Sequence, residues 1–134
     1  MKIFERDGKV NFVDDNNVFV GFEYEKLCCE SFGWCLTREF PSVLKEGENG
    51  IDPAGYQFDA AYFEQRFPVT DWDVSSETVL KTEADLYAHG SAAIFRLTKD
   101  KEEIFLMLWN DHNGFYAHGF EMKSGDEKLR GDWL

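Results

Sequence analysis

Three apolar runs in the last third of the chain, separated by polar turns, constrain the fold more than any other feature of the sequence. The first run, residues 92–98, leads into a charged turn, and the second, residues 104–109, is almost continuously apolar. A short apolar run bounded by turn residues favours a strand covered on both faces over a helix. Asn113 and Gly114 are typical of a two-residue hairpin turn, and the aromatic-rich residues 115–120 follow them. The pattern predicts three consecutive antiparallel strands, which form a meander at the centre of the sheet.

The first third of the chain predicts a second small meander. Apolar or alternating runs occupy residues 1–5, 10–13 and 18–24, and polar turns separate them. The first of these turns contains Asp7-Gly8, a dipeptide common in hairpins. A further strand is predicted at residues 32–36, where Gly33 indicates a bend or a close backbone approach.

One helix is predicted between these two sets of strands. Asp59 is a favourable cap for a helix over residues 60–66, which ends before Pro68. Residues 78–84 fit either an edge strand or an irregular loop. The expected fold class is therefore α+β, a strand-dominated antiparallel meander sheet with one short helix near residues 59–66.

Length and composition predict a single globular domain over residues 1–134. A chain of 134 residues with 43% hydrophobic residues, including 13 phenylalanines, is able to fill one core. No apolar run approaches the roughly 20 residues that a membrane-spanning helix needs, and the first residues do not form the apolar region of a signal peptide. Three cysteines, two of them adjacent, do not form a disulfide framework of the secreted kind. These features predict a cytoplasmic protein with reduced thiols and no membrane contact.

The net charge of −12 narrows the choice of partners. Residues 36–91 hold 11 acidic and 4 basic residues, so the middle of the chain carries most of the imbalance. Such a chain repels phosphate backbones, so direct binding to nucleic acid is not expected. Two hypotheses fit the acidity: it keeps the protein soluble, or it mimics nucleic acid and blocks a basic nucleic-acid-binding protein.

Candidate chemistry is concentrated in Cys28-Cys29-Glu30 and in the histidines near the predicted hairpin. Cysteine, histidine and carboxylate are the ligands of zinc-type sites, with Cys29 and His118 as the best pair here. The adjacent cysteines depart from the usual C-x-x-C spacing, because neighbouring side chains in a strand point to opposite faces. Buried packing of the thiols and a reactive thiol beside a histidine are the alternatives. No cofactor is expected.

Three further groups of residues have a structural and a functional interpretation. Alternation places His118 on one strand face with Tyr116 and Phe120, as a core residue or as a functional one. The acidic residues 23, 25 and 30 form either a solvated strand face or a carboxylate cluster, and the four tryptophans line either the core or a ligand pocket. The candidate functional cluster consists of Cys28, Cys29, Glu30, His112, Tyr116 and His118.

Two blocks of the sequence resemble a group of small proteins from bacteria and their phages. These are Cys28-Cys29-Glu30-Ser31 and residues 113–120, which resemble the C-C-E segment and the downstream N-G-Y-Y-S-type hairpin of that group. Phe115 stands in place of the first tyrosine, and Ala117 in place of the serine. The family is a domain of unknown function, so the resemblance implies neither an activity nor a cofactor. It does imply that the two blocks meet in space.

Three functions are consistent with these patterns. The first is a non-enzymatic protein-interaction or accessory domain, which in a phage or mobile element would inhibit a basic host protein. The second is a small metal- or thiol-dependent protein that uses Cys28, Cys29, Glu30 and His118. The third is a small-ligand-binding domain with an aromatic pocket.

Overall fold

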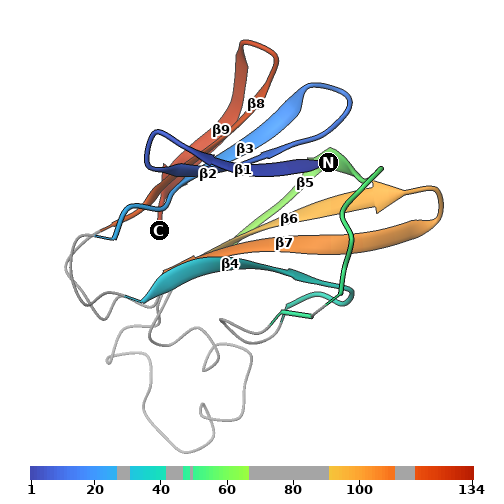
Figure 1. Cartoon of the computed structure of the whole chain (residues 1–134), viewed down its shortest axis with the longest axis horizontal. Coiled ribbons are helices and arrows are strands. Elements are labelled where there is room, and N and C mark those ends of the chain that lie inside the picture. Colours follow the sequence, from blue (N-terminus) through green and yellow to red (C-terminus); the bar gives the residue numbers. More distant parts are fainter. Residues whose placement is uncertain (27–30, 42–46, 49, 67–90, 111–116) are drawn as a thin grey trace, which may run out of the picture.

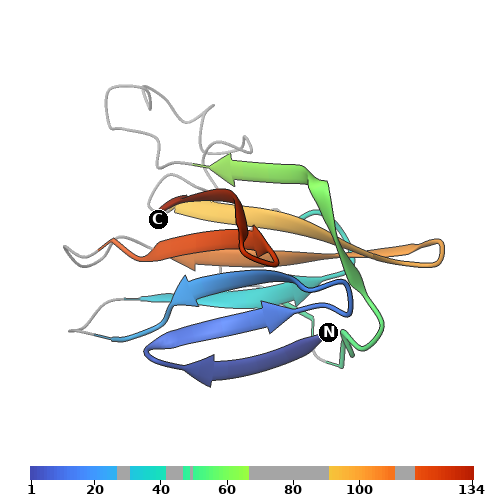
Figure 2. The same ribbon diagram turned by 90° about the horizontal axis from the view of Figure 1, so that it is seen from above.

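Two antiparallel sheets lie face to face in the computed structural model, which describes residues 1–26, 31–41, 47–48, 50–66, 91–110 and 117–134 (Figure 1). The strands are β1 (Lys2–Arg6), β2 (Lys9–Val13), β3 (Val18–Glu23), β4 (Phe32–Thr37), β5 (Gln57–Arg66), β6 (Ser91–Lys99), β7 (Glu102–Asn110), β8 (Gly119–Ser124) and β9 (Glu127–Trp133). Seen from above, the strands of both sheets run in similar directions (Figure 2), as in an aligned β-sandwich. The described part of the chain contains no helix long and apolar enough to cross a membrane.

The five-stranded sheet has the order β1-β2-β3-β8-β9, and the four-stranded sheet the order β4-β7-β6-β5. The predicted N-terminal meander is confirmed as β1, β2 and β3. Its first turn has positive φ at Asp7 (53°) and Gly8 (72°), as a type I′ hairpin turn requires. The prediction of an antiparallel, strand-dominated fold is therefore correct.

The predicted C-terminal meander is correct for two of its three strands. The β6–β7 hairpin pairs in continuous register from Ser91↔Asn110 to Lys99↔Glu102. The third strand, predicted at residues 115–120 beside β7, is instead β8, which begins at Gly119 and lies between β3 and β9 in the other sheet. Strand β7 already has β4 and β6 as neighbours, so it offers no edge to a third partner. The Asn113-Gly114 turn lies outside the described residues, as do residues 78–84.

The predicted helix at residues 59–66 is wrong, because these residues belong to strand β5. Asp59 does accept a hydrogen bond from the Ala61 N–H (3.1 Å), the contact on which the capping argument rested. That local turn coincides with an irregularity in the β5–β6 register between Phe58 and Phe63. Hydrogen bonds to β6 then pair the backbone N–H and C=O groups of β5. These tertiary contacts override the local preference for a helix. Asp59 also binds Arg96 on β6, with oxygen–nitrogen distances of 2.6 and 3.1 Å.

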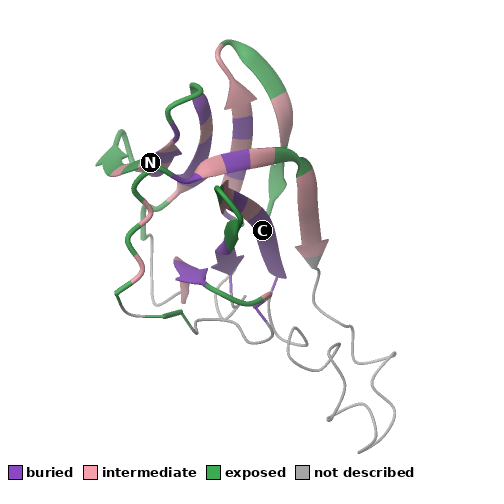
Figure 3. Cartoon of the chain, turned by 90° about the vertical axis from the view of Figure 1, so that its right-hand side faces the viewer, coloured by how far each residue is buried: buried purple, intermediate pink, exposed green. Residues whose placement is uncertain are grey.

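The core fills the space between the sheets, and buried residues occur on strands of both sheets (Figure 3). Phe95 on β6 is fully buried, and its ring centroid lies 5.3 Å from that of Phe63 and 6.0 Å from that of Phe120. A second buried cluster lies on the other face of the four-stranded sheet, around Ile94 and Met107. The four-stranded sheet is thus covered on both faces, whereas the outer face of the five-stranded sheet is more open.

Asp14, in the turn between β2 and β3, joins the two sheets. Its carboxylate is buried, and Oδ1 accepts hydrogen bonds from the N–H groups of Asn16 and Val18, both at 2.9 Å. Oδ2 accepts a third, from the N–H of Phe58 on β5, also at 2.9 Å. One side chain therefore closes a turn of the five-stranded sheet and fixes the start of β5 in the other sheet.

Candidate functional site

The structure describes one member of the predicted functional cluster, His118. The remaining members lie outside the described residues: Cys28, Cys29, Glu30, His112 and Tyr116. The meeting of the C-C-E segment with the hairpin therefore stays a prediction. Within the described ranges, no group of three or more histidine, cysteine, aspartate or glutamate residues is arranged to hold a metal ion.

His118 is buried just before β8 and links several elements. Its Nδ1 lies 3.1 Å from the carbonyl oxygen of Glu23, and because a carbonyl only accepts, Nδ1 carries the hydrogen. Its backbone N–H and C=O each pair with Leu134 at 2.9 Å, and its ring stacks on Phe32 with centroids 3.8 Å apart. These contacts give His118 a structural role in holding β3, β4 and the C-terminal residues together.

Cys35, the third cysteine, lies on β4 in the second buried cluster. Burial raises the pKa of its thiol to about 11. The thiol is therefore protonated at neutral pH, and because the thiolate is the reactive form, Cys35 is a poor nucleophile.

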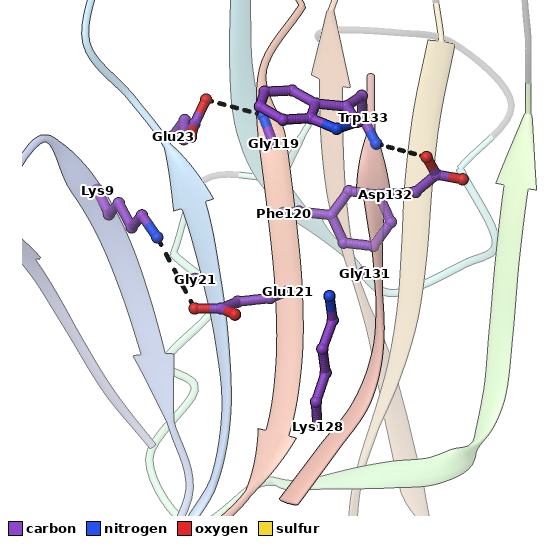
Figure 4. Close-up of a pocket in the computed structure, with 10 residues that line it drawn as sticks. All are labelled: Lys9, Gly21, Glu23, Gly119, Phe120, Glu121, Lys128, Gly131, Asp132 and Trp133. Atoms are coloured by element: carbon purple, nitrogen blue, oxygen red, sulfur yellow. Dashed lines mark hydrogen bonds and ion pairs between the residues drawn. The ribbon is translucent and has the colours of Figure 1, made fainter. Parts of the chain in front are cut away.

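The most distinctive surface feature is a depression on the outer face of the five-stranded sheet, here called the glycine hollow (Figure 4). It has a volume of about 260 Å³ and three glycines on neighbouring strands, Gly21 on β3, Gly119 on β8 and Gly131 on β9. The larger side chains around them are Lys9, Glu23, Glu121, Lys128, Asp132 and Trp133. Pairing across the sheet places Glu121 directly between Gly21 and Gly131.

Gly119 brings a carboxylate and an indole ring together in this hollow. A Cβ atom at Gly119 would lie 3.3 Å from both the Glu23 side chain and the Trp133 ring. Glu23 Oε2 also accepts the Gly119 N–H at 3.0 Å (Figure 4). Trp133 is 58% exposed, although its neighbour Leu134 is buried. Leu134 therefore docks on the body of the protein, while Trp133 faces solvent.

The charges around the glycine hollow are only partly paired. Glu121 forms ion pairs with Lys9 (3.7 Å) and with Lys123 (3.5 Å). Glu23, Lys128 and Asp132 have no ion pair among the described residues. The hollow thus offers carboxylate acceptors and an ammonium donor beside an exposed aromatic ring.

A second depression, here called the aromatic hollow, adjoins the first one and shares Lys9 with it. It has a volume of about 380 Å³ over strands β1 to β3, and its apolar lining consists of Phe4, Val13 and Phe19. Phe4 is 44% exposed, and its strand β1 is an edge of the sheet. Exposed apolar groups beside a sheet edge are a common basis for protein contacts.

Sequence reasoning missed both hollows as sites. It considered Trp133 among the four tryptophans that line the core or a ligand pocket, and Glu23 as part of a carboxylate cluster, but it did not bring them together. The available signal was a glycine inside each of two predicted strands, Gly21 in residues 18–24 and Gly119 in residues 115–120. Interior glycines weaken a strand and often mark the close approach of a ligand or a second backbone.

Comparison of the chain with protein-family models, with curated proteins and with solved structures gave no match. The geometry of the two hollows and the chemistry of their residues are therefore the basis for a function.

Proposed function

We propose that this protein is a non-enzymatic interaction or accessory domain that binds another protein at the aromatic hollow and the adjacent edge of β1. The supporting observation is the exposed Phe4 on an edge strand, beside Val13 and Phe19. A partner strand added to such an edge gains backbone hydrogen bonds, and its side chains reach the neighbouring hollow. Aromatic residues are enriched at the energetic centres of protein interfaces.

The proposed partner is a basic protein in the cytoplasm. The net charge of −12 favours an approach by a positively charged surface and disfavours nucleic acid. If the gene belongs to a phage or mobile element, the function that follows is inhibition of a basic host protein. The association rate should then fall as salt screens the attraction.

Replacing Phe4 tests this proposal. Phe4→Ser should weaken binding by tenfold or more, because it removes the apolar anchor from the hollow. The partner is first recovered by affinity capture with the wild-type protein and is then purified for titration calorimetry with each variant. Tyr24→Ser is the matched control, since Tyr24 is 36% exposed and does not line the hollow. Equal affinity of wild type and Phe4→Ser for every captured partner would exclude this surface.

The metal- or thiol-dependent function is a second proposal. Donation from Nδ1 to the Glu23 carbonyl leaves Nε2 as the nitrogen with the lone pair, and metal-binding histidines commonly have this arrangement. Under this proposal Cys29 and His118 are the central ligands. Native mass spectrometry of freshly purified, unreduced protein should then show a stoichiometric metal that Cys29→Ser removes. A metal-free mass for the wild-type protein would contradict the metal site.

A further inference from the structure

The glycine hollow has features of a ligand site that the proposed protein interaction does not use. We propose that it binds a neutral sugar ring, one pyranose unit of an oligosaccharide, packed against the indole of Trp133. The site is centred on strands β3, β8 and β9, whereas the proposed protein contact is centred on Phe4 and the edge of β1, and the two linings share one residue, Lys9. The two proposals therefore stand or fall separately.

Gly21 keeps the hollow open, although the fold itself does not require a glycine at this position. Gly21 lies within a strand and has no positive φ, and a Cβ there would have no neighbour closer than 3.4 Å. Neither the backbone conformation nor crowding therefore requires a glycine. Gly131 differs, because a Cβ there would lie 2.8 Å from the Phe120 carbonyl oxygen. The absence of a side chain at Gly21 opens the hollow at a cost in strand stability, as is common where a ligand approaches the backbone.

The exposed indole of Trp133 offers an apolar surface on which a sugar ring can pack. A ring that is 58% exposed leaves a large apolar surface in water, while part of it lies 3.3 Å from the Cβ position of Gly119. A pyranose ring has one face of C–H groups, and these carry the partial positive charge that the electron-rich face of an indole attracts. Covering Trp133 with a sugar would remove apolar area from water on both partners.

Side chains of both charges line the hollow. Glu23 and Glu121 are acceptors, and Lys128 is a donor whose Nζ lies 3.2 Å from the Cβ position of Gly131. An anion would meet the two carboxylates, and a cation would meet Lys128 and Lys9, so a charged ligand is opposed from one side in either case. A hydroxyl group both donates and accepts, so a neutral polyhydroxylated ring is complementary to all of these groups.

The size of the hollow limits both the size of the ligand and its affinity. Its 260 Å³ is smaller than the roughly 300–1,000 Å³ of pockets that enclose a drug-sized ligand, which suits a single ring. One stacked ring with a few hydrogen bonds should give a dissociation constant on the order of 1 mM. The neighbouring rings of the oligosaccharide would remain largely in solvent.

Nuclear magnetic resonance of ¹⁵N-labelled protein tests the proposal. The chain has four tryptophans, and Trp133→Phe identifies the indole N–H signal of Trp133 by its loss. The probes are maltotriose, cellotriose and tri-N-acetylchitotriose, each titrated to about 10 mM, well above the expected dissociation constant. At least one trisaccharide should shift the Trp133 indole signal together with the backbone amides of Gly119 and Glu121.

Variants then separate binding from folding. Trp133→Ala should weaken trisaccharide binding, measured from the amide shifts, at least tenfold. Gly21→Ala should also weaken trisaccharide binding. Its thermal stability should stay equal to that of the wild type or rise, because alanine fits at position 21 and reduces the freedom of the unfolded chain. Phe4→Ser, the variant that tests the protein interaction, should leave sugar binding unchanged.

Three results would overturn the proposal. The first is that no trisaccharide shifts the Trp133 signal. The second is that the amide shifts persist undiminished in Trp133→Ala. The third is that N-acetylarginine amide shifts the Trp133 signal and the sugars do not, which would identify the hollow as a site for a cationic side chain of a protein.

Discussion

Phe95→Ala should lower the free energy of unfolding by about 3–5 kcal/mol, the range for removal of a buried phenylalanine ring. Phe95 is fully inaccessible, and its ring contacts Phe58, Phe63 and Phe120 with centroid distances of 5.3 to 6.2 Å. These neighbours come from β5 and from β8 in the opposite sheet, so the cavity would open between the two layers. Urea denaturation followed by circular dichroism measures the change.

Two further variants make this result interpretable. Phe4→Ala removes the same ring from an exposed site and should cost far less. If Phe95→Ala does not fold, Phe95→Leu keeps most of the volume and should cost about 1–2 kcal/mol. A loss below about 1 kcal/mol for Phe95→Ala, with an unchanged denaturant slope, would mean that the ring is not at the centre of the core.

Most strands could be predicted from the sequence because their signals are local. Asp7-Gly8 specifies a tight turn, and the alternation in residues 10–13 specifies a half-buried strand, so β1 to β3 follow directly. At Gly33 the sequence indicated a bend or a close backbone approach, and the close neighbour is instead a side chain, since a Cβ there would lie 2.9 Å from the Trp109 ring.

The errors arose where partners distant in sequence decide the outcome. Residues 60–66 have good helix formers and a capping aspartate, but the open edge of β6 determines their conformation. The strand order of β8 depends on the neighbours that β7 already has, and no local pattern contains that information. For the same reason, periodicity did not separate a strand that continues a meander from one that crosses to the second sheet.

The candidate site was harder to predict than the fold. Glu23, Gly119 and Trp133 are far apart in sequence and become neighbours only through the pairing of β3, β8 and β9. His118 was considered both as a core residue and as a ligand, and its contacts with Glu23, Phe32 and Leu134 support the structural role.

Asp14→Ala should lower the free energy of unfolding by about 2–5 kcal/mol. The substitution leaves three backbone N–H groups without their acceptor, and the bonds to Val18 and Phe58 are buried. A buried donor left unsatisfied costs about 1–3 kcal/mol, whereas the N–H of the exposed Asn16 is able to bond to water. The neighbouring Asp15→Ala, at an exposed position, should change stability by about 0.5 kcal/mol or less.

Asp14→Asn tests whether both carboxylate oxygens are needed, because asparagine keeps the shape of the side chain but has one acceptor oxygen. Asparagine keeps one oxygen, but its amide nitrogen would face a backbone N–H, either that of Phe58 or those of Asn16 and Val18. Its cost should therefore lie between those of Asp15→Ala and Asp14→Ala. If Asp14→Asn is as stable as the wild type, one oxygen is sufficient, and either the bond to Phe58 or the bonds to Asn16 and Val18 are dispensable. If it is as destabilised as Asp14→Ala, the simultaneous use of both oxygens is what joins the β2–β3 turn to β5.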